Sequence, residues 1–258
     1  MENDKKSGAA VQAAPEEGKT VAAAQTAPAQ GIQEAKAAPA KAEVTAAKPE
    51  KKDEHKYGFS FLYWVLVRVY HVLVKLLFFV RIEGKENIPK DRNIILMGNH
   101  QFIFDPVTLA ICDKSRQYHF MGKKELWNNK IVGWIWTQVH GFPVDRGNYD
   151  MGAIRTAMNI LSRGESLGIF PEGTRHKGPG MLPLLSGASM IALRSKCPVV
   201  PIYIDGDYSL FRRITVRVGK PVEMDDLAAG RVTREACETL TGRIEARFAE
   251  LSGGRSRA

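Results

Sequence analysis

Two residues whose side chains suit proton transfer, His100 and Asp105, are separated by four residues in the segment NHQFIFDP. The apolar run at 94–98 before them is typical of a buried strand, and residues 107–111 after them are typical of the start of a helix. Open α/β sheets place their chemistry at such turns, at the carboxyl ends of strands, so we expect a catalytic pair here. A simpler interpretation is also open, in which Asp105 caps the helix, Pro106 occupies its first position and His100 is a hydrogen-bonded core residue.

The net charge of +9 lies entirely outside the N-terminal part of this 258-residue chain. Residues 1–56 carry nine lysines and nine acidic residues, so residues 57–258 supply the whole excess of positive charge. A basic surface suits nucleic acid, an anionic membrane or a phosphorylated ligand. The aromatic residues form no nucleic-acid-binding motif, and the apolar segment at 59–81 favours a membrane surface as partner over nucleic acid.

The cysteines predict neither a disulfide framework nor a metal site. Cys112, Cys197 and Cys237 are odd in number and widely spaced, which disfavours both disulfide pairing and zinc binding. Their apolar surroundings indicate buried thiols. The beginning of the sequence has no apolar stretch, so we expect no cleavable secretory signal.

Composition divides the chain into three parts. Residues 1–56 are rich in Ala, Pro, Lys, Glu and Gln and contain no aromatic residue, which predicts a disordered tail. Whether this tail is a tether or has no function is left open. We expect a membrane-associated helix at 57–82 and a catalytic domain at 83–258.

The apolar segment at 59–81 is long enough to cross a bilayer as a helix. Its polar members fall on one helical face, and a central Arg and Lys would each cost about 2.5–3.5 kcal/mol in a spanning helix, whereas each apolar neighbour returns only about 0.3–0.6 kcal/mol. We therefore favour an amphipathic helix that lies in the membrane interface, with a spanning helix and a core helix of the domain as alternatives. The polar members of the segment are Ser60, Trp64, Arg68, His71 and Lys75.

Candidate strands alternate with candidate helices along the rest of the chain. This alternation predicts an α/β domain with a largely parallel central sheet flanked by helices. The expected strands are 82–89 (a short strand and turn), 94–98, 118–122, 166–170, 198–204 and 214–219. One expected helix begins at 106, and three more are expected at 150–163, 184–195 and 233–251.

Four segments in a fixed order carry a resemblance to a known family. They are NHQFIFDP at 99–106, GFPVDR at 141–146, FPEGTR at 170–175 and VVPIYI at 199–204. Their order and spacing resemble the glycerolipid acyltransferase superfamily, and most closely its 1-acylglycerol-3-phosphate acyltransferases, over roughly residues 59–220. The resemblance implies an α/β sheet beneath a basic catalytic cleft, anchored to a membrane by N-terminal helices. No nucleotide-binding loop or serine-nucleophile elbow competes with this interpretation.

The resemblance implies a role for each of the two opening residues. His100 would be the general base that takes the proton of an attacking hydroxyl, and Asp105 would orient it and stabilise the imidazolium. The acyl group would pass directly from a thioester to this hydroxyl. No cofactor or metal is then expected beyond the acyl donor.

The same resemblance implies that basic residues bind the phosphate of the acceptor. Arg146 and Arg175 match the arginines of the second and third motifs, and Lys123 resembles a further member of the cluster. A salt bridge between Arg146 and Asp145, and a solvated charge at Lys123, are the simpler alternatives.

The third motif would also contact the acceptor. Glu172, Gly173 and Thr174 match the family's acceptor-binding residues, although Gly173 can equally mark a tight turn that requires a positive φ. Phe170 and Pro171 are expected to shape this turn. One departure from the family follows, because residues 183–188 (PLLSGA) lack the lysine that many members carry before the Gly-Ala pair.

The expected reaction is the transfer of a fatty acyl group from acyl-CoA or acyl carrier protein to lysophosphatidic acid, which gives phosphatidic acid at the cytoplasmic face of the cell membrane. Another lysophospholipid, glycerol 3-phosphate or an amino lipid as acceptor is the alternative. A non-catalytic lipid-binding protein is a third hypothesis. Donor, acyl-chain length and oligomeric state are left open, with Trp127, Trp134 and Trp136 as candidates for the lining of an acyl tunnel.

Overall fold

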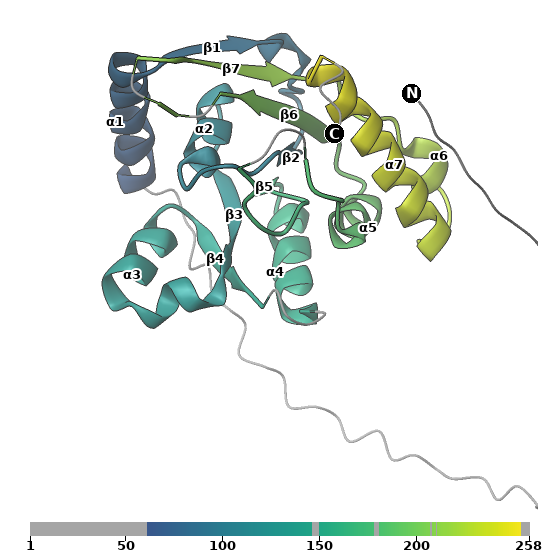
Figure 1. Ribbon diagram of the computed structural model, residues 1–258. Coiled ribbons are helices and arrows are strands. Elements are labelled where there is room, and N and C mark those ends of the chain that lie inside the picture. Colours follow the sequence, from purple (N-terminus) through teal and green to yellow (C-terminus); the bar gives the residue numbers. More distant parts are fainter. Residues whose placement is uncertain (1–60, 146–149, 178–180, 207, 210, 254–258) are drawn as a thin grey trace, which may run out of the picture. The chain divides into compact units, whose positions relative to one another are not determined.

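The computed structural model describes residues 61–145, 150–177, 181–206, 208–209 and 211–253, all within one compact unit at 53–258 (Figure 1). The tail expected at 1–56 and the first residues of the expected membrane helix lie outside the described residues. Arg146 lies outside them as well.

Seven strands in the described residues form one sheet, in the order β1-β7-β6-β2-β5-β3-β4. Only β6 and β7 pair antiparallel, so the prediction of a largely parallel sheet is confirmed. Because β2 to β6 all run in one direction, the residues that follow them meet at one edge of the sheet. The strands are β1 (Phe79–Glu83), β2 (Ile95–Gly98), β3 (Tyr118–Lys123), β4 (Gly141–Val144), β5 (Ser166–Ile169), β6 (Val199–Asp205) and β7 (Arg213–Val218).

Helices cover both faces of the sheet. Those of one face are α4 (Met151–Ser162), α5 (Ser186–Ser195), α6 (Asp225–Ala228) and α7 (Arg234–Leu251). Those of the opposite face are α1 (Phe61–Leu77) and α2 (Asp105–Cys112) (Figure 1). The remaining helical segments are α3 (Lys130–Gln138) and two short 3-10 turns, η1 (Lys85–Asn87) and η2 (Lys124–Asn128).

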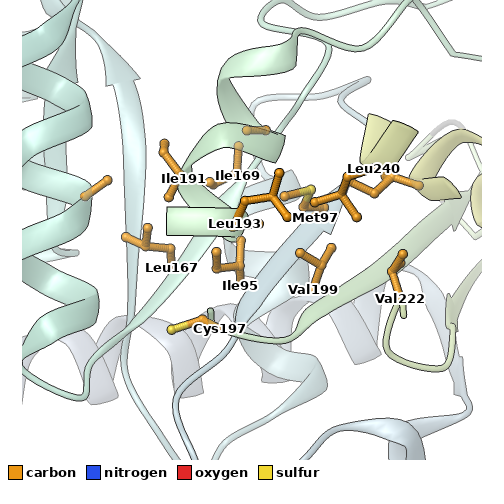
Figure 2. Packing of buried hydrophobic residues seen from close by; sticks show 14 of the residues in the cluster. Ile95, Met97, Leu167, Ile169, Ile191, Leu193, Cys197, Val199, Val222 and Leu240 are labelled. Atoms are coloured by element: carbon orange, nitrogen blue, oxygen red, sulfur yellow. The ribbon is translucent and has the colours of Figure 1, made fainter. Parts of the chain in front are cut away.

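The core follows the two-residue period of the strands. Ile95 and Met97 face α5 and α7, where they join the cluster of apolar side chains shown in Figure 2. Ile94 and Leu96 face the opposite way and pack with α1 and α2. All four side chains are fully buried. β2 is therefore packed on both faces, and this packing holds the start of the following turn in place.

The boundary between the first helix and the first strand differs from the sequence prediction. α1 ends at Leu77 and β1 begins at Phe79, whereas the helix was expected to continue to 81 and the strand to begin at 82. Val80 pairs with Ile214 of β7, and this long-range pairing decides the conformation. A short run of aromatic and β-branched residues fits a helix or a strand equally well by hydropathy alone.

α1 has two apolar faces. Tyr63, Val67 and Val74 are buried against the domain, as the core-helix alternative predicted. Phe61, Val72 and Leu76, on the other face, are 77%, 62% and 71% exposed. None of the helices in the described part of the chain has the length and hydropathy needed to cross a bilayer.

The cysteine and tryptophan predictions have different outcomes. All three cysteines are free and buried, as expected, and burial raises the pKa of Cys112 to about 12. Trp127 and Trp136 pack against each other with ring centroids 6.4 Å apart, and Trp134 is 58% exposed.

Candidate active site

The turn after β2 is bound to the neighbouring strand β6 by one side chain. The amide nitrogen of Asn99 donates to the carbonyl of Ile204 (3.0 Å), and its amide oxygen accepts from the backbone N–H of the same residue (2.7 Å). Gly98 allows α2 to approach closely, since a Cβ atom there would lie 2.9 Å from the side chain of Leu109. The turn thus leaves the sheet in a fixed direction.

His100 and Asp105 form a buried pair within this turn. Nδ1 of His100 lies 2.9 Å from Oδ2 of Asp105. The same oxygen accepts the backbone N–H groups of Gln101 (2.6 Å) and Phe102 (2.7 Å). An ionised carboxylate only accepts hydrogen bonds, so Nδ1 carries the proton and Nε2 is left as the basic nitrogen.

The helix-capping interpretation of Asp105 is wrong. Phe104 is the N-cap residue, and Asp105 is the first residue of α2. Its carboxylate turns back toward the strand because Gln101 and Phe102 present backbone donors there. The carboxylate of Asp105 therefore holds the imidazole and the backbone of the turn, and it does not cap the helix.

Phe170 holds the imidazole from one side. This residue follows β5, which is adjacent to β2, and its ring stacks on His100 with centroids 4.1 Å apart and planes at 22°. The sequence assigned Phe170 only to the shape of its own turn. The contact with His100 was not predicted, because it arises from the pairing of two strands.

Glu172 joins the third motif to the first. Its Oε1 accepts the backbone N–H of His100 (2.7 Å), and its Oε2 accepts that of Leu182 (2.8 Å). The backbone N–H of His176 donates to the carbonyl of His100 at 2.8 Å, which closes a second link. Burial raises the pKa of the Glu172 carboxyl above its usual value. In this structure Glu172 fixes the position of His100 through the backbone.

Gly173 is required for the turn that follows. Its φ of +70° lies in the left-handed region, and a Cβ atom there would lie 2.6 Å from Leu185. Both observations confirm the tight-turn alternative.

The predicted basic residues lie at the same edge of the sheet as far as the structure describes them. Arg175 is exposed and directly precedes His176, which is bonded to His100. Thr174 beside it is also exposed. Lys123 is exposed at the end of β3 and pairs with Glu125 at 3.3 Å.

The predicted phosphate ligand Arg146 is not among the described residues. The simpler alternative paired it with Asp145. The carboxylate of Asp145 forms an ion pair with Lys124.

A largely apolar cavity of about 540 Å³ opens next to the third motif. Phe170 and Gly173 connect it to the pair, and α4, α5 and the ends of β3, β4 and β5 all contribute to its wall. No tryptophan lines it, so the three candidates named for an acyl tunnel do not form this cavity. Its apolar lining includes Met121, Val144, Ile154, Ile169, Leu185 and Ile191.

Sequence reasoning missed one residue that touches the pair. The hydroxyl of Tyr208 donates to Oδ1 of Asp105 at 2.8 Å. Burial and the nearby Asp105 raise the pKa of Tyr208 well above 10. Tyr208 follows β6, and no signal in the sequence indicated that β6 would lie beside β2.

The site can act as a base without a protein nucleophile. Among the described residues, no serine or cysteine is hydrogen-bonded to His100, and no cluster of His, Cys, Asp or Glu could hold a metal ion. A basic Nε2 next to an apolar cavity suits the activation of a hydroxyl for attack on an apolar substrate.

Comparison with known proteins identifies the class of protein to which this chain belongs. A family model described as Acyltransferase matches residues 79–205. A protein named 1-acyl-sn-glycerol-3-phosphate acyltransferase from Bacillus subtilis is 35% identical over 67% of this chain and 87% of its own length. One of the same name from Streptococcus pneumoniae is 34% identical over 64% of this chain and 63% of its own.

A solved structure agrees with these relatives. The crystal structure of the 1-acyl-sn-glycerophosphate (LPA) acyltransferase PlsC from Thermotoga maritima is 26% identical, with a TM-score of 0.56 over 74% of this chain and 78% of that one. The fold is that of an acyltransferase. The chain belongs to the 1-acylglycerol-3-phosphate acyltransferase family.

Proposed function

We propose that this enzyme transfers a fatty acyl group from the thioester of acyl-CoA or acyl carrier protein to the free hydroxyl of 1-acyl-sn-glycerol 3-phosphate, which yields phosphatidic acid. The observation that carries the proposal is the buried pair of His100 and Asp105, which leaves Nε2 as a base. Family membership and the names of the relatives support the choice of acceptor.

The proposed reaction uses the pair as follows. Nε2 of His100 takes the proton of the acceptor hydroxyl while the oxygen attacks the thioester carbonyl carbon. The tetrahedral intermediate collapses, the C–S bond breaks, and the imidazolium returns its proton to the departing thiolate. Asp105 stabilises the imidazolium during these steps. Because the thioester is already activated, the proposed step requires no cofactor, and the base contributes about 10²–10⁴-fold to the rate.

We assign the acceptor phosphate to Arg175, with Arg146 and Lys123 as further ligands. A guanidinium pairs two phosphate oxygens at once, which suits it to this task. Arg175 directly precedes His176, whose backbone N–H donates to the carbonyl of His100. A phosphate bound to Arg175 would therefore lie close to the base.

We assign the apolar cavity of about 540 Å³ to a fatty acyl chain. Its volume falls within the roughly 300–1,000 Å³ of typical ligand pockets. Phe170 lies between His100 and the cavity, so the carbonyl end of a bound chain would be near Nε2.

We further propose that the enzyme works on the cytoplasmic face of the cell membrane, with the exposed apolar side chains of α1 in contact with lipid. This exposed apolar surface continues beyond α1. The backbone N–H of Phe211 donates a hydrogen bond to the carbonyl of Leu77, and the ring of Phe104 packs on Tyr70. Phe211 is 70% and Phe104 46% exposed, and Phe104 belongs to the catalytic turn. A lipid acceptor would thus meet apolar surface on its way to His100.

The decisive experiment measures acyl transfer by purified protein from labelled acyl-CoA or acyl carrier protein to a panel of acceptors. Lysophosphatidic acid should be the preferred acceptor, ahead of glycerol 3-phosphate, other lysophospholipids and amino lipids. Preference for an acceptor without a phosphate monoester would contradict the assignment of Arg175.

The Arg175→Ala variant tests the phosphate assignment directly. We expect the KM for lysophosphatidic acid to rise about tenfold or more, since a bidentate charged hydrogen bond is lost, with Arg175→Lys in between. The matched control is Arg163→Ala, which removes an arginine that pairs with Glu165 at the opposite edge of the sheet. An unchanged KM in Arg175→Ala would refute the assignment.

A further inference from the structure

Tyr208 has an unusual backbone for a large residue. Its φ of +52° lies in the left-handed region, which is unfavourable for a side chain with a Cβ atom. Such conformations persist where the surrounding contacts hold them, and they are frequent at functional sites. The Tyr208 side chain is buried, and its hydroxyl points at Oδ1 of Asp105, the carboxylate oxygen that His100 does not use.

The hydroxyl of Tyr208 is the last of three in a row. It lies 2.8 Å from Oγ1 of Thr108, which lies 3.0 Å from the hydroxyl of Tyr70. Asp105 can only accept, so Tyr208 donates to it. The short contacts then require Thr108 to donate to Tyr208 and Tyr70 to donate to Thr108. The carbonyl of Phe104 is a more distant acceptor, at 3.3 Å from Oγ1 of Thr108 and 3.4 Å from the hydroxyl of Tyr70. The three protons therefore point in one direction, toward the carboxylate, and each bond polarises the next.

Both phenols keep their protons near neutral pH. Burial raises the pKa of Tyr70 to about 12 and raises that of Tyr208 well above 10. All three hydroxyls are therefore available as donors near neutral pH.

The ring of Tyr208 is held as firmly as its hydroxyl. Phe102, in the catalytic turn, stacks on it with centroids 5.0 Å apart and planes at 21°. Phe78, between α1 and β1, meets it edge-on at 5.9 Å. The residue is thus wedged between the catalytic turn and the first helix.

We infer that Tyr208 is a positioning residue for acyl transfer, supported by Thr108 and Tyr70, and that it fixes the carboxylate of Asp105 so that Oδ2 stays on Nδ1 of His100. A carboxylate held through one oxygen alone can rotate and exchange its two oxygens. A donor on each oxygen prevents this rotation. The inference rests on the proposed role of His100 as the base.

The row of hydroxyls also gives α1 a second role. Tyr70 lies on the inner side of the helix whose outer side we assign to lipid. α1 is therefore part of the support of the active site, and its position on the domain bears on the geometry of the base.

The test compares hydroxyl-deleted variants in the acyl-transfer assay, with the acceptor that the wild-type enzyme uses fastest. Tyr208→Phe keeps the ring and its stack on Phe102. We expect its kcat to fall about tenfold, as for the loss of one hydrogen bond to a charged group, with KM values for both substrates within about twofold. Thr108→Val and Tyr70→Phe should lower kcat less, about threefold, because they act through Tyr208. Adding Tyr70→Phe to Tyr208→Phe should change nothing further.

Tyr118→Phe is a matched control. The hydroxyl of Tyr118 donates to Oδ2 of Asp113 at 2.9 Å, so this variant also removes a buried bond between a tyrosine and an aspartate, but at the opposite edge of the sheet. It should lower the Tm about as much as Tyr208→Phe does and leave kcat unchanged. In a His100→Ala background, Tyr208→Phe should have no further effect on the residual rate.

Three results would overturn the inference. The first is an unchanged kcat in Tyr208→Phe. The second is an equal fall of kcat in Tyr118→Phe. The third is a tenfold fall of the residual rate when Tyr208→Phe is added to His100→Ala. A wild-type enzyme that ignores lysophosphatidic acid but acylates another acceptor would refute the proposed acceptor alone, and the same variants would still decide the role of Tyr208.

Discussion

The carboxylate of Asp105 is the most heavily bonded group of the site. Oδ2 accepts from His100, Gln101 and Phe102, and Oδ1 accepts from Tyr208. The side chain is fully buried, so the charge depends on these four donors for its stability. Few substitutions at this position preserve the shape of the turn.

Asp105→Asn separates charge from shape. Its amide matches the carboxylate in size but can present an N–H to Nδ1 of His100, which would move the imidazole proton to Nε2 and remove the base. We expect kcat to fall about 10²–10⁴-fold with little change in KM. Asp113→Asn, at the other edge of the sheet, is the control and should retain kcat. Comparable turnover by Asp105→Asn and wild type would exclude the proposed base.

At this scale the sequence predicted the residues of short motifs and missed those that the fold brings in. His100 and Asp105 lie within one turn, so their proximity follows from local chain geometry. Phe170 and Tyr208 reach the pair from β5 and β6, and their roles depend on which strands flank β2. Neither residue type nor spacing carries that information.

At the scale of elements, α1 combines a core face with an exposed apolar face, and the sequence presented the corresponding roles, in the core and at a membrane, as alternatives. Its inner face contributes Tyr63 and Val67 to the core, and its outer face exposes apolar side chains. Hydropathy detects both faces as apolar and cannot assign either one. Removal of residues 57–81 should therefore cause aggregation, because it uncovers the core as well as removing the proposed lipid contact.

Substitutions on the outer face separate these functions. Val72→Ser with Leu76→Ser should weaken binding to anionic vesicles by tenfold or more, since each buried aliphatic side chain contributes roughly 1.5–3 kcal/mol. The Tm should stay within a few degrees, because both side chains are exposed. Cosedimentation with vesicles measures the first effect and calorimetry the second. Unaltered vesicle affinity in the double variant would argue against this face as the lipid contact.

The wall of the apolar cavity offers a second test of this kind. Gly187, near the start of α5, lines the cavity, and an added Cβ would meet no atom within 4 Å. Gly187→Leu should fill part of the space and shift activity toward shorter acyl chains, whereas Gly187→Ala should keep the wild-type profile. A chain-length series of donors and of acceptors, assayed separately, shows which chain the cavity holds. An identical profile in Gly187→Leu would mean that no acyl chain binds there.

At the scale of the whole molecule, we expect a buried histidine at the edge of the sheet opposite the candidate active site to lower stability in acid. His119 is buried there, with Nε2 2.6 Å from Glu165 and its ring stacked on His140 at 4.8 Å. Burial lowers the pKa of His119 to about 4, with His140 adding to the effect. The folded protein therefore keeps His119 neutral where the unfolded chain would protonate it.

The sign of the pH dependence follows from this difference. Between about pH 6.5 and pH 4 the unfolded chain binds the extra proton, so the free energy of unfolding should fall as the pH is lowered, by on the order of 2 kcal/mol. His119→Gln should flatten this part of the curve. Denaturant unfolding at a series of pH values provides the measurement, and a pH dependence unaltered in His119→Gln would assign the effect to other groups.

The order of strands also determines when the active site forms during synthesis. Ile95 of β2 pairs with Leu167 and Val199, so β2 has no neighbour until β5 has been made. His100 then waits for Glu172, 72 residues later, and Asp105 waits for Tyr208, 103 residues later. Contacts of such long range form slowly, and a chain arrested before β5 exposes the unpaired edges of β2. The proposed base is encoded in one short turn, but its contacts can be complete only when most of the domain has left the ribosome.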